Sequence, residues 1–217
     1  MGYKQSQEWQ KYCTLIKARP EAFRNNGSID IITDINKVEK FVEATGKKVG
    51  VIYYSSYNLW VVDLVKSGDR YYTYERLLPA VERGAVVTIP KFGEKYVLLK
   101  QYRHALRDYQ YAFPRGFGEK GIAAESNAGK EIAEELGTSV VKSKFLGQVI
   151  ADSGCCGNSV DIYVCDILEP QIQMGYEGIQ GMVVIEESEL KQWIGSGKIT
   201  DGFTLSAWAL LQAQRTK

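Results

Sequence analysis

Residues 116–137 read Gly116-Phe-Gly-Glu-Lys-Gly-Ile-Ala-Ala-Glu-Ser-Asn-Ala-Gly-Lys-Glu-Ile-Ala-Glu-Glu-Leu-Gly137. A glycine-rich turn leads into a short predicted helix that carries Glu131, Glu134 and Glu135. At about 100° of rotation per residue, these three carboxylates lie within an arc of roughly 100° on the helix surface. The apolar residues of the helix project to the opposite side, where they can pack on a core. Gly137 supplies the left-handed residue that ends the helix.

Three carboxylates on one helix face repel one another unless a positive charge lies among them. Within this helix only Lys130 is near. Oxygen-rich clusters of this kind suit the hard divalent cations Mg²⁺ and Mn²⁺, which in turn bind phosphate oxygens. The spacing alone is explained equally well by an ordinary exposed acidic helix, so both interpretations stay open at this point.

The stretch resembles the Nudix box, whose pattern is G-x5-E-x7-R-E-U-x-E-E-x-G-U, where U is an apolar residue. Placed on this sequence, the box begins at Gly116 and ends at Thr138. The positions that match are Gly116, Glu131, Ile132, Glu134, Glu135 and Gly137. Three positions depart from the pattern: Ile122 replaces the first Glu, Lys130 replaces the Arg, and Thr138 replaces the last apolar residue.

The sequence around the box is similar to the ADP-ribose pyrophosphatase-like branch of the Nudix superfamily. Gln101-Tyr102-Arg103, followed by Phe113-Pro114-Arg115-Gly116, resembles the approach to the box in that branch. Residues 197–207 resemble its closing turn and helix. The resemblance covers roughly residues 85–217 well and the N-terminal third only loosely.

The resemblance implies a site for a metal-bound diphosphate. Glu134 and Glu135 would be the main metal ligands, and Glu131 would be a further ligand or would orient the attacking water. The backbone carbonyl of Gly116 would supply another oxygen, which accounts for a glycine that must come close to the ion. The implied cofactor is Mg²⁺ or Mn²⁺.

Two arginines are candidates for holding a substrate phosphate, because a guanidinium binds phosphate oxygens with two parallel hydrogen bonds. These are Arg103 and Arg115, and for each a structural ion pair is an equally good interpretation. His104, the only histidine, is expected to be structural. In the related branch a loop after the box brings a glutamate toward the water, and the matching position here is Asn158, with Asp152 and Asp161 as possible substitutes.

Hydrophobic periodicity predicts an α+β fold, with a small N-terminal subdomain of helices and an antiparallel sheet. For the rest of the chain, the resemblance implies a Nudix α/β/α sandwich with a mixed sheet. The expected domains are 1–84 and 85–217. Helices are expected at residues 7–24 (broken at Pro20), 35–45, 187–196 and 203–214, besides the helix of the box. Strands are expected at residues 29–33, 49–54, 60–66, 71–78, 85–90, 96–102, 146–151, 160–168 and 182–185. Asp201 or Thr200 is expected to cap the last helix.

The composition, with 45% hydrophobic and 24% charged residues, is typical of a soluble globular protein. A formal net charge of +1 gives no reason to expect nucleic acid or a membrane as a partner. The N-terminus is too polar for a signal peptide, so we expect a cytoplasmic protein whose four cysteines are reduced thiols. The resemblance implies a homodimer formed through the N-terminal sheet.

These observations lead to competing hypotheses. The first is a metal-dependent hydrolase that cleaves the pyrophosphate of a nucleoside diphosphate derivative, such as ADP-ribose or a nucleotide sugar. The second is a catalytically weakened Nudix fold that binds or senses a nucleotide, because Ile122, Lys130 and Asn158 each weaken the expected site. A third is an isomerase acting on an isoprenoid diphosphate, but neither Cys155 nor Cys156 is placed convincingly for that chemistry.

Overall fold

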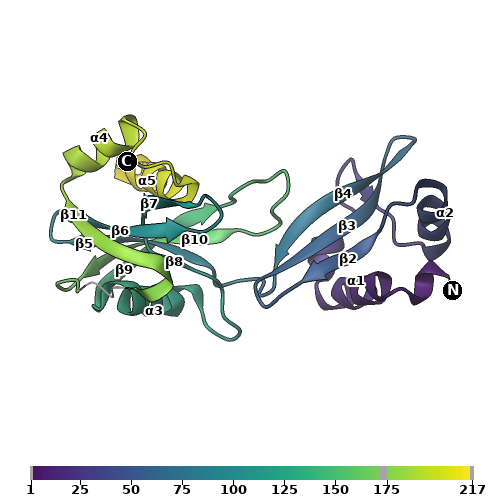
Figure 1. Cartoon of the computed structure of the whole chain (residues 1–217), viewed down its shortest axis with the longest axis horizontal. Coiled ribbons are helices and arrows are strands. Elements are labelled where there is room, and N and C mark those ends of the chain that lie inside the picture. The colour runs from purple at the N-terminus through teal and green to yellow at the C-terminus, as the bar shows by residue number, and fades with distance from the viewer. Residues whose placement is uncertain (1, 172–174, 216–217) are drawn as a thin grey trace. The chain divides into compact units, whose positions relative to one another are not determined.

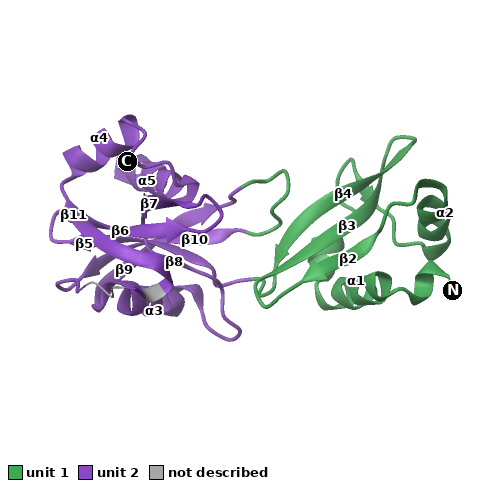
Figure 2. Ribbon diagram, in the orientation of Figure 1, with its two compact units in different colours: residues 1–82, 152–158 green, residues 83–151, 159–217 purple. Residues whose placement is uncertain are grey.

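The computed structural model describes residues 2–171 and 175–215. The chain divides into two compact units, each with its own sheet (Figure 2). Unit 1 comprises Met1–Glu82 and Asp152–Asn158, and unit 2 comprises Arg83–Ala151 and Ser159–Lys217. The units differ from the expected domains chiefly because residues 152–158 group with unit 1, so the division into 1–84 and 85–217 stays a prediction.

Unit 1 is a small antiparallel sheet with helices packed against it (Figure 1). Strands β2 (Gly50–Tyr54), β3 (Asn58–Ser67) and β4 (Arg70–Pro79) pair in sequence, and the short β1 (Asp30–Ile31) pairs with β3. Helix α1 (Gln7–Ala18) is capped by Ser6, whose side chain accepts from the Trp9 backbone N–H. The remaining elements are η1 (Tyr3–Gln5), η2 (Pro20–Phe23) and α2 (Ile35–Thr45). The expected helix at 7–24 is thus divided before Pro20, which begins η2.

A buried ion pair ties the elements of unit 1 together. Asp63 on β3 is 1% exposed and accepts hydrogen bonds from the Tyr12 hydroxyl of α1 and from the Arg76 guanidinium of β4. Arg76 also donates to the Ala22 carbonyl of η2, with an N–O distance of 2.7 Å. Asp63 and Arg76 together therefore join α1 and η2 to the β3–β4 hairpin.

Asp63→Asn is expected to lower the free energy of unfolding by about 3 kcal/mol, because breaking a buried pair leaves the charge of Arg76 uncompensated. Urea unfolding measures the change. Asp69→Asn, in the exposed turn between β3 and β4, is the matched control and should leave stability unchanged. Equal stability of the two variants would contradict the structural role of Asp63.

Unit 2 contains a mixed sheet with the strand order β11-β6-β5-β10-β9. Strand β10 (Val160–Ile167) runs parallel to β5 (Val86–Phe92), and the other pairs are antiparallel. The remaining strands are β6 (Lys95–Arg103), β9 (Val140–Val149) and β11 (Ile179–Ile185), with the short β7 (Asp108–Ala112) on β6 and β8 (Arg115–Gly116) on β5. The sequence did not predict β7 and β8, and β9 begins six residues before the expected start at residue 146.

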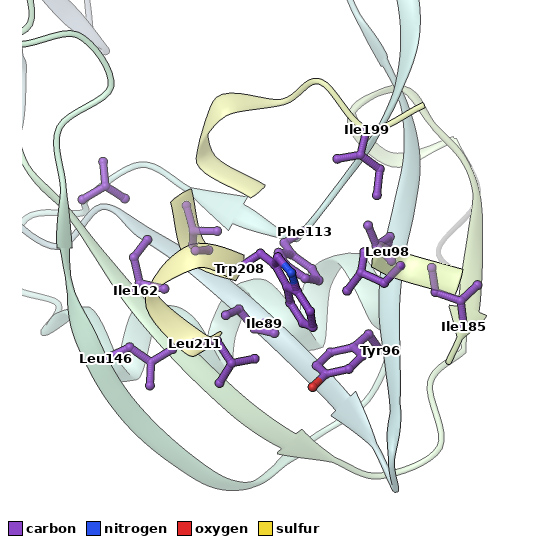
Figure 3. Packing of buried hydrophobic residues seen from close by; sticks show 14 residues of the cluster. Ile89, Tyr96, Leu98, Phe113, Leu146, Ile162, Ile185, Ile199, Trp208 and Leu211 are labelled. Atoms are coloured by element: carbon purple, nitrogen blue, oxygen red, sulfur yellow. The ribbon is translucent and has the colours of Figure 1, made fainter. Parts of the chain in front are cut away.

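Helices cover both faces of this sheet, as predicted (Figure 1). On one face, α3 (Ala124–Leu136) buries Ala128, Ile132 and Leu136. On the other face lie α4 (Glu187–Gly195) and α5 (Gly202–Arg215), whose Leu190 and Trp208 pack in the cluster of Figure 3. A 3₁₀ turn, η3 (Tyr176–Gly178), precedes β11. Among the described residues, no helix is long and apolar enough to cross a membrane.

Strand β6 connects the two cores because its side chains alternate between the faces of the sheet. Tyr96 and Leu98 join the core under α4 and α5, whereas Val97 and Leu99 join the core under α3. The same alternation assigns Gln101 and Arg103, the last residues of this row, to the α3 face. The α3 face of β6 is therefore apolar at Val97 and Leu99 and polar at Gln101 and Arg103.

Candidate functional site

Helix α3 positions the candidate carboxylates. Its apolar residues at i, i+4 and i+8, from Ala128 to Leu136, are buried against the sheet, which fixes the helix rotation. Gly137 ends the helix with φ 57°, as the sequence predicted. The carboxylates at 131, 134 and 135 therefore lie along one border of the buried face.

Glu135 is the most deeply buried of these carboxylates, at 2% exposure. Burial, followed by the charge of Glu131, raises its pKa to about 8, while Arg103 acts in the opposite direction. Burial likewise raises the pKa of Glu131 to about 7, with the charge of Glu134 as the next cause. One carboxylate oxygen of Glu135, Oε2, is buried without a hydrogen-bond partner in the described structure. These two groups are costly to ionise unless a cation joins them.

This cost predicts how the stability of the metal-free protein depends on pH. Below about pH 4.5, the ordinary glutamate value, both carboxyls are protonated in the folded and unfolded states. As the pH rises toward about 8, the unfolded chain releases protons that the folded chain retains. The free energy of unfolding therefore falls across this window and levels off above it.

Glu135→Gln should flatten this fall and raise the free energy of unfolding at pH 9 by roughly 1–3 kcal/mol, because the glutamine needs no proton. Urea unfolding with a chelator at pH 5, 7 and 9 measures the effect. Glu125→Gln, an exposed position in the first turn of α3, is the control. The same pH dependence in the Glu135→Gln variant and the parent would contradict the burial effect.

Gly116 lies against Glu131. It pairs with Val86 in the β5–β8 ladder, and a Cβ atom added at Gly116 would lie 1.8 Å from Oε1 of Glu131. Only glycine allows this close approach between the strand and the carboxylate. The sequence analysis expected the Gly116 backbone to come close to a metal ion, and the role of its carbonyl as a ligand stays a prediction.

Gly116→Ala should displace the Glu131 side chain and lower kcat/KM by roughly 10- to 100-fold, since misplacing a functional group by about 1 Å has effects of that size. Gly129→Ala, within α3, is the matched control because no atom lies within 4 Å of its added Cβ. That control should be slightly more stable than the parent. Unchanged kcat/KM in Gly116→Ala would show that the position of Glu131 does not matter.

Lys130 is held by two carboxylates, one of which the sequence analysis did not single out. Its Nζ is hydrogen-bonded to Glu119 and lies 3.2 Å from Oε1 of Glu134. The hydrogen bond with Glu119 is the main cause that raises the pKa of Lys130. In this chain Ile122 replaces the first Glu of the box pattern. Glu119 thus supplies a carboxylate partner for Lys130 from a different position.

The two candidate arginines differ in their partners. Arg115 forms an ion pair with Asp201, at 3.1 Å, and its guanidinium lies over the Phe203 ring. The Nε atom of Arg103 is buried without a hydrogen-bond partner among the residues that the structure describes. Burial lowers the pKa of Arg103, and the like charge of Arg115 contributes next. Arg115 therefore has the structural ion pair that the sequence left open, whereas Arg103 is suited to an incoming anion.

Two neighbouring clefts share Arg115, Asp201 and Gly202. The first has a volume of about 280 Å³ and the second about 220 Å³. Asp201 also caps α5, because its Oδ2 accepts from the Thr204 backbone N–H at 3.0 Å. The first cleft is lined in addition by Arg103, His104, Ala105, Leu106, Gln110 and Thr200.

A fourth carboxylate, that of Glu177 in η3, affects the electrostatics of the site formed by Glu131 and Glu135. Its charge raises the pKa of both Glu131 and Glu135 and also acts on Arg103. The sequence analysis missed Glu177 because it belongs to no motif and follows a segment without a periodic pattern.

The positions that the sequence analysis suggested for this glutamate have other contacts. Asp152 and Asn158 belong to unit 1, where the backbone of the same loop bonds to Leu77 of β4. Asp161 accepts a hydrogen bond from Gln148, at 2.7 Å.

The carboxylates fit a hard divalent cation by their chemistry. They offer oxygen ligands, and the unpartnered Oε2 of Glu135 is an acceptor that a cation would satisfy. Within the described part of the chain, however, no three His, Cys, Asp or Glu side chains are gathered closely enough to hold an ion without adjustment. Glu134 is paired with Lys130, at 3.2 Å.

Comparison with known proteins supports the fold. No protein-family model matches the chain. The chain is 27% identical over 116 residues to "ADP compounds hydrolase NudE" of Escherichia coli (strain K12), and the match covers 54% of this chain and 62% of that protein. A solved structure described as "Crystal structure of ADP compounds hydrolase" superposes with a TM-score of 0.67 at 18% identity, covering 77% of this chain and 91% of the other. The predicted α+β fold is thereby confirmed.

Proposed function

Because the resemblance to the ADP-ribose pyrophosphatase-like branch of the Nudix superfamily is supported by both sequence and fold, we propose that this chain hydrolyses the pyrophosphate of a nucleoside diphosphate derivative. The observation that carries the proposal is the buried carboxylate of Glu135, which has an unpartnered oxygen and a raised pKa beside Arg103. A buried acid with an unpartnered oxygen is costly, and such groups cluster at functional sites.

The roles of the residues follow from their surroundings. Glu131, Glu134 and Glu135 would hold Mg²⁺ or Mn²⁺, which when bound neutralises the phosphate oxygens. The Arg103 guanidinium donates to a phosphate oxygen from the α3 face of β6. Lys130, fixed by Glu119, limits the repulsion among the carboxylates of α3.

Glu177 is the proposed general base. Its carboxylate accepts a proton from the water that attacks one phosphorus atom, and the bond between that phosphorus and the bridging oxygen breaks. The products are a nucleoside monophosphate and a phosphorylated remainder. The effect of the Glu177 charge on both Glu131 and Glu135 supports this assignment.

A substrate screen tests the proposal. ADP-ribose, sugar nucleotides, NADH and dinucleoside polyphosphates are incubated with Mg²⁺ or Mn²⁺, and the products are separated by chromatography. ADP-containing compounds are tested first because both similar proteins are described as ADP compounds hydrolases. We expect metal-dependent release of a nucleoside monophosphate, and no turnover above a Glu135→Gln control would contradict the hydrolase function.

The second candidate is a nucleotide-binding module that does not turn its ligand over. Ile122 within the box favours it, since a carboxylate is missing there. The pairing of Glu119 with Lys130 weighs against the binding module, because Glu119 supplies the negative charge that is missing at position 122. Calorimetric binding with the ligand recovered intact would support the module, and metal-dependent product release would exclude it.

The assembly and the compartment are further proposals. The sheet of unit 1 exposes large side chains, including Tyr53, Trp60 and Tyr71, that a homodimer would cover. Light scattering on the purified chain tests the dimer. A cytoplasmic location, in which the four cysteines would stay reduced thiols, is part of the proposal.

A further inference from the structure

Gln101 is a buried polar residue on the α3 face of β6, between Leu99 and Arg103. It is 3% exposed, and its amide Nε2 donates to the backbone carbonyl of Glu177 at 2.9 Å. Its Oε1 is also buried and has no hydrogen-bond partner among residues 2–171 and 175–215. A leucine at this position would continue the apolar row of β6 without an unpaired oxygen, so packing does not explain the glutamine.

The turn that Gln101 holds has an unusual backbone. Glu177 has φ 45° and ψ 33°, the left-handed region that non-glycine residues rarely adopt. Gly178 follows with φ 81°, and a Cβ atom added to it would lie 3.2 Å from the Tyr102 carbonyl oxygen. Strain of this kind persists only where the surrounding structure maintains it. The turn is therefore pressed against β6, and the Gln101 amide contributes a side-chain hydrogen bond that holds it there.

From this arrangement we infer that Gln101 is a positioning residue: by holding the Glu177 carbonyl, it fixes the direction of the Glu177 carboxylate toward Glu131 and Glu135. The inference rests on the proposed function, because Glu177 must act on the water for its direction to matter. Gln101 does not touch the reacting atoms and acts only through Glu177.

A double-mutant cycle distinguishes this role from a structural one. Gln101→Leu should lower kcat by roughly 10- to 100-fold, because a general base that is misdirected by about 1 Å loses most of its effect. In a Glu177→Gln background the same substitution should cause no further loss, since the group it positions is gone. The melting temperature should not fall, because the substitution also removes the unpaired Oε1.

Two further measurements accompany the cycle. Hydrogen exchange of the amides of residues 175–181 should be faster in Gln101→Leu than in the parent. Gln214→Leu is the matched control: its amide also donates to a backbone carbonyl, that of Leu146, on the α5 side of the sheet. This control should retain the parent's kcat.

The outcomes separate the inference from the proposed function. If the parent chain shows no metal-dependent turnover, the proposed function fails first. If the parent is active but the losses of Gln101→Leu and Glu177→Gln multiply, or Gln101→Leu keeps the parent's kcat, the positioning role of Gln101 is wrong. Non-additive losses with faster exchange in residues 175–181 would support it.

Discussion

Glu135→Gln is expected to lower kcat by at least about 10³-fold with ADP-ribose or whichever nucleoside diphosphate derivative is the best substrate. The amide keeps the shape of the side chain but loses the negative charge that the cation requires. Because Glu135 is 2% exposed, no solvent molecule can easily take over its role. Steady-state kinetics at saturating Mg²⁺ measures the loss.

Two controls exclude a trivial explanation for this loss. Glu125→Gln makes the same chemical change on the exposed first turn of α3 and should keep the parent's kcat. The Glu135→Gln variant should also be at least as stable as the parent at pH 9, so the loss cannot come from unfolding. A Glu135→Gln variant that retains a tenth or more of the activity would contradict the role of Glu135 as a ligand.

Glu177→Gln is expected to lower kcat by about 10²- to 10⁴-fold, the usual contribution of a general base. The affinity for Mn²⁺ should change much less than kcat, because Glu177 lies in η3 and not on the helix that carries the proposed ligands.

Glu189→Gln, on the exposed side of α4, is the control for this second substitution and should behave as the parent. If Mn²⁺ affinity and kcat fall by the same factor in Glu177→Gln, the residue is a metal ligand and not the base. If kcat does not change, Glu177 has no part in the reaction.

The sequence predicted the helix of the box and its border of carboxylates because the information is local. Ile132 and Leu136 recur at helical spacing, and Gly137 marks the end, so the rotation of the helix follows from the pattern. The antiparallel sheet of unit 1 was predicted for a similar reason: short β-rich runs are separated by turn residues.

The missed strands have weaker local signals. β8 contains two residues, and the turn before β7 contains no glycine: its left-handed position is Arg107, with φ 57°. A non-glycine residue in that conformation gives no sign in the sequence. β9 begins in a stretch where charged residues interrupt the alternation, so its first residues were not recognised.

The missed site residues depend on tertiary structure. Glu119 lies in the turn before α3 and contacts Lys130 within that helix. Glu177 lies in a turn before β11. Neither lies at a spacing that predicts a contact. The suggestion of Asn158 came from placing a family pattern on a loop whose backbone pairs instead with β4 of unit 1.

The central claim is that the buried acidic border of α3 binds a divalent cation, and calorimetric titration with Mn²⁺ at pH 7 tests it most directly. Run in two buffers with different protonation enthalpies, the titration also counts released protons. Since the pKa values of Glu131 and Glu135 are about 7 and 8, the parent should release between about one and two protons on binding, and the Glu131→Gln/Glu135→Gln variant should bind far more weakly. Equal affinity in both proteins, without proton release, would contradict the claim.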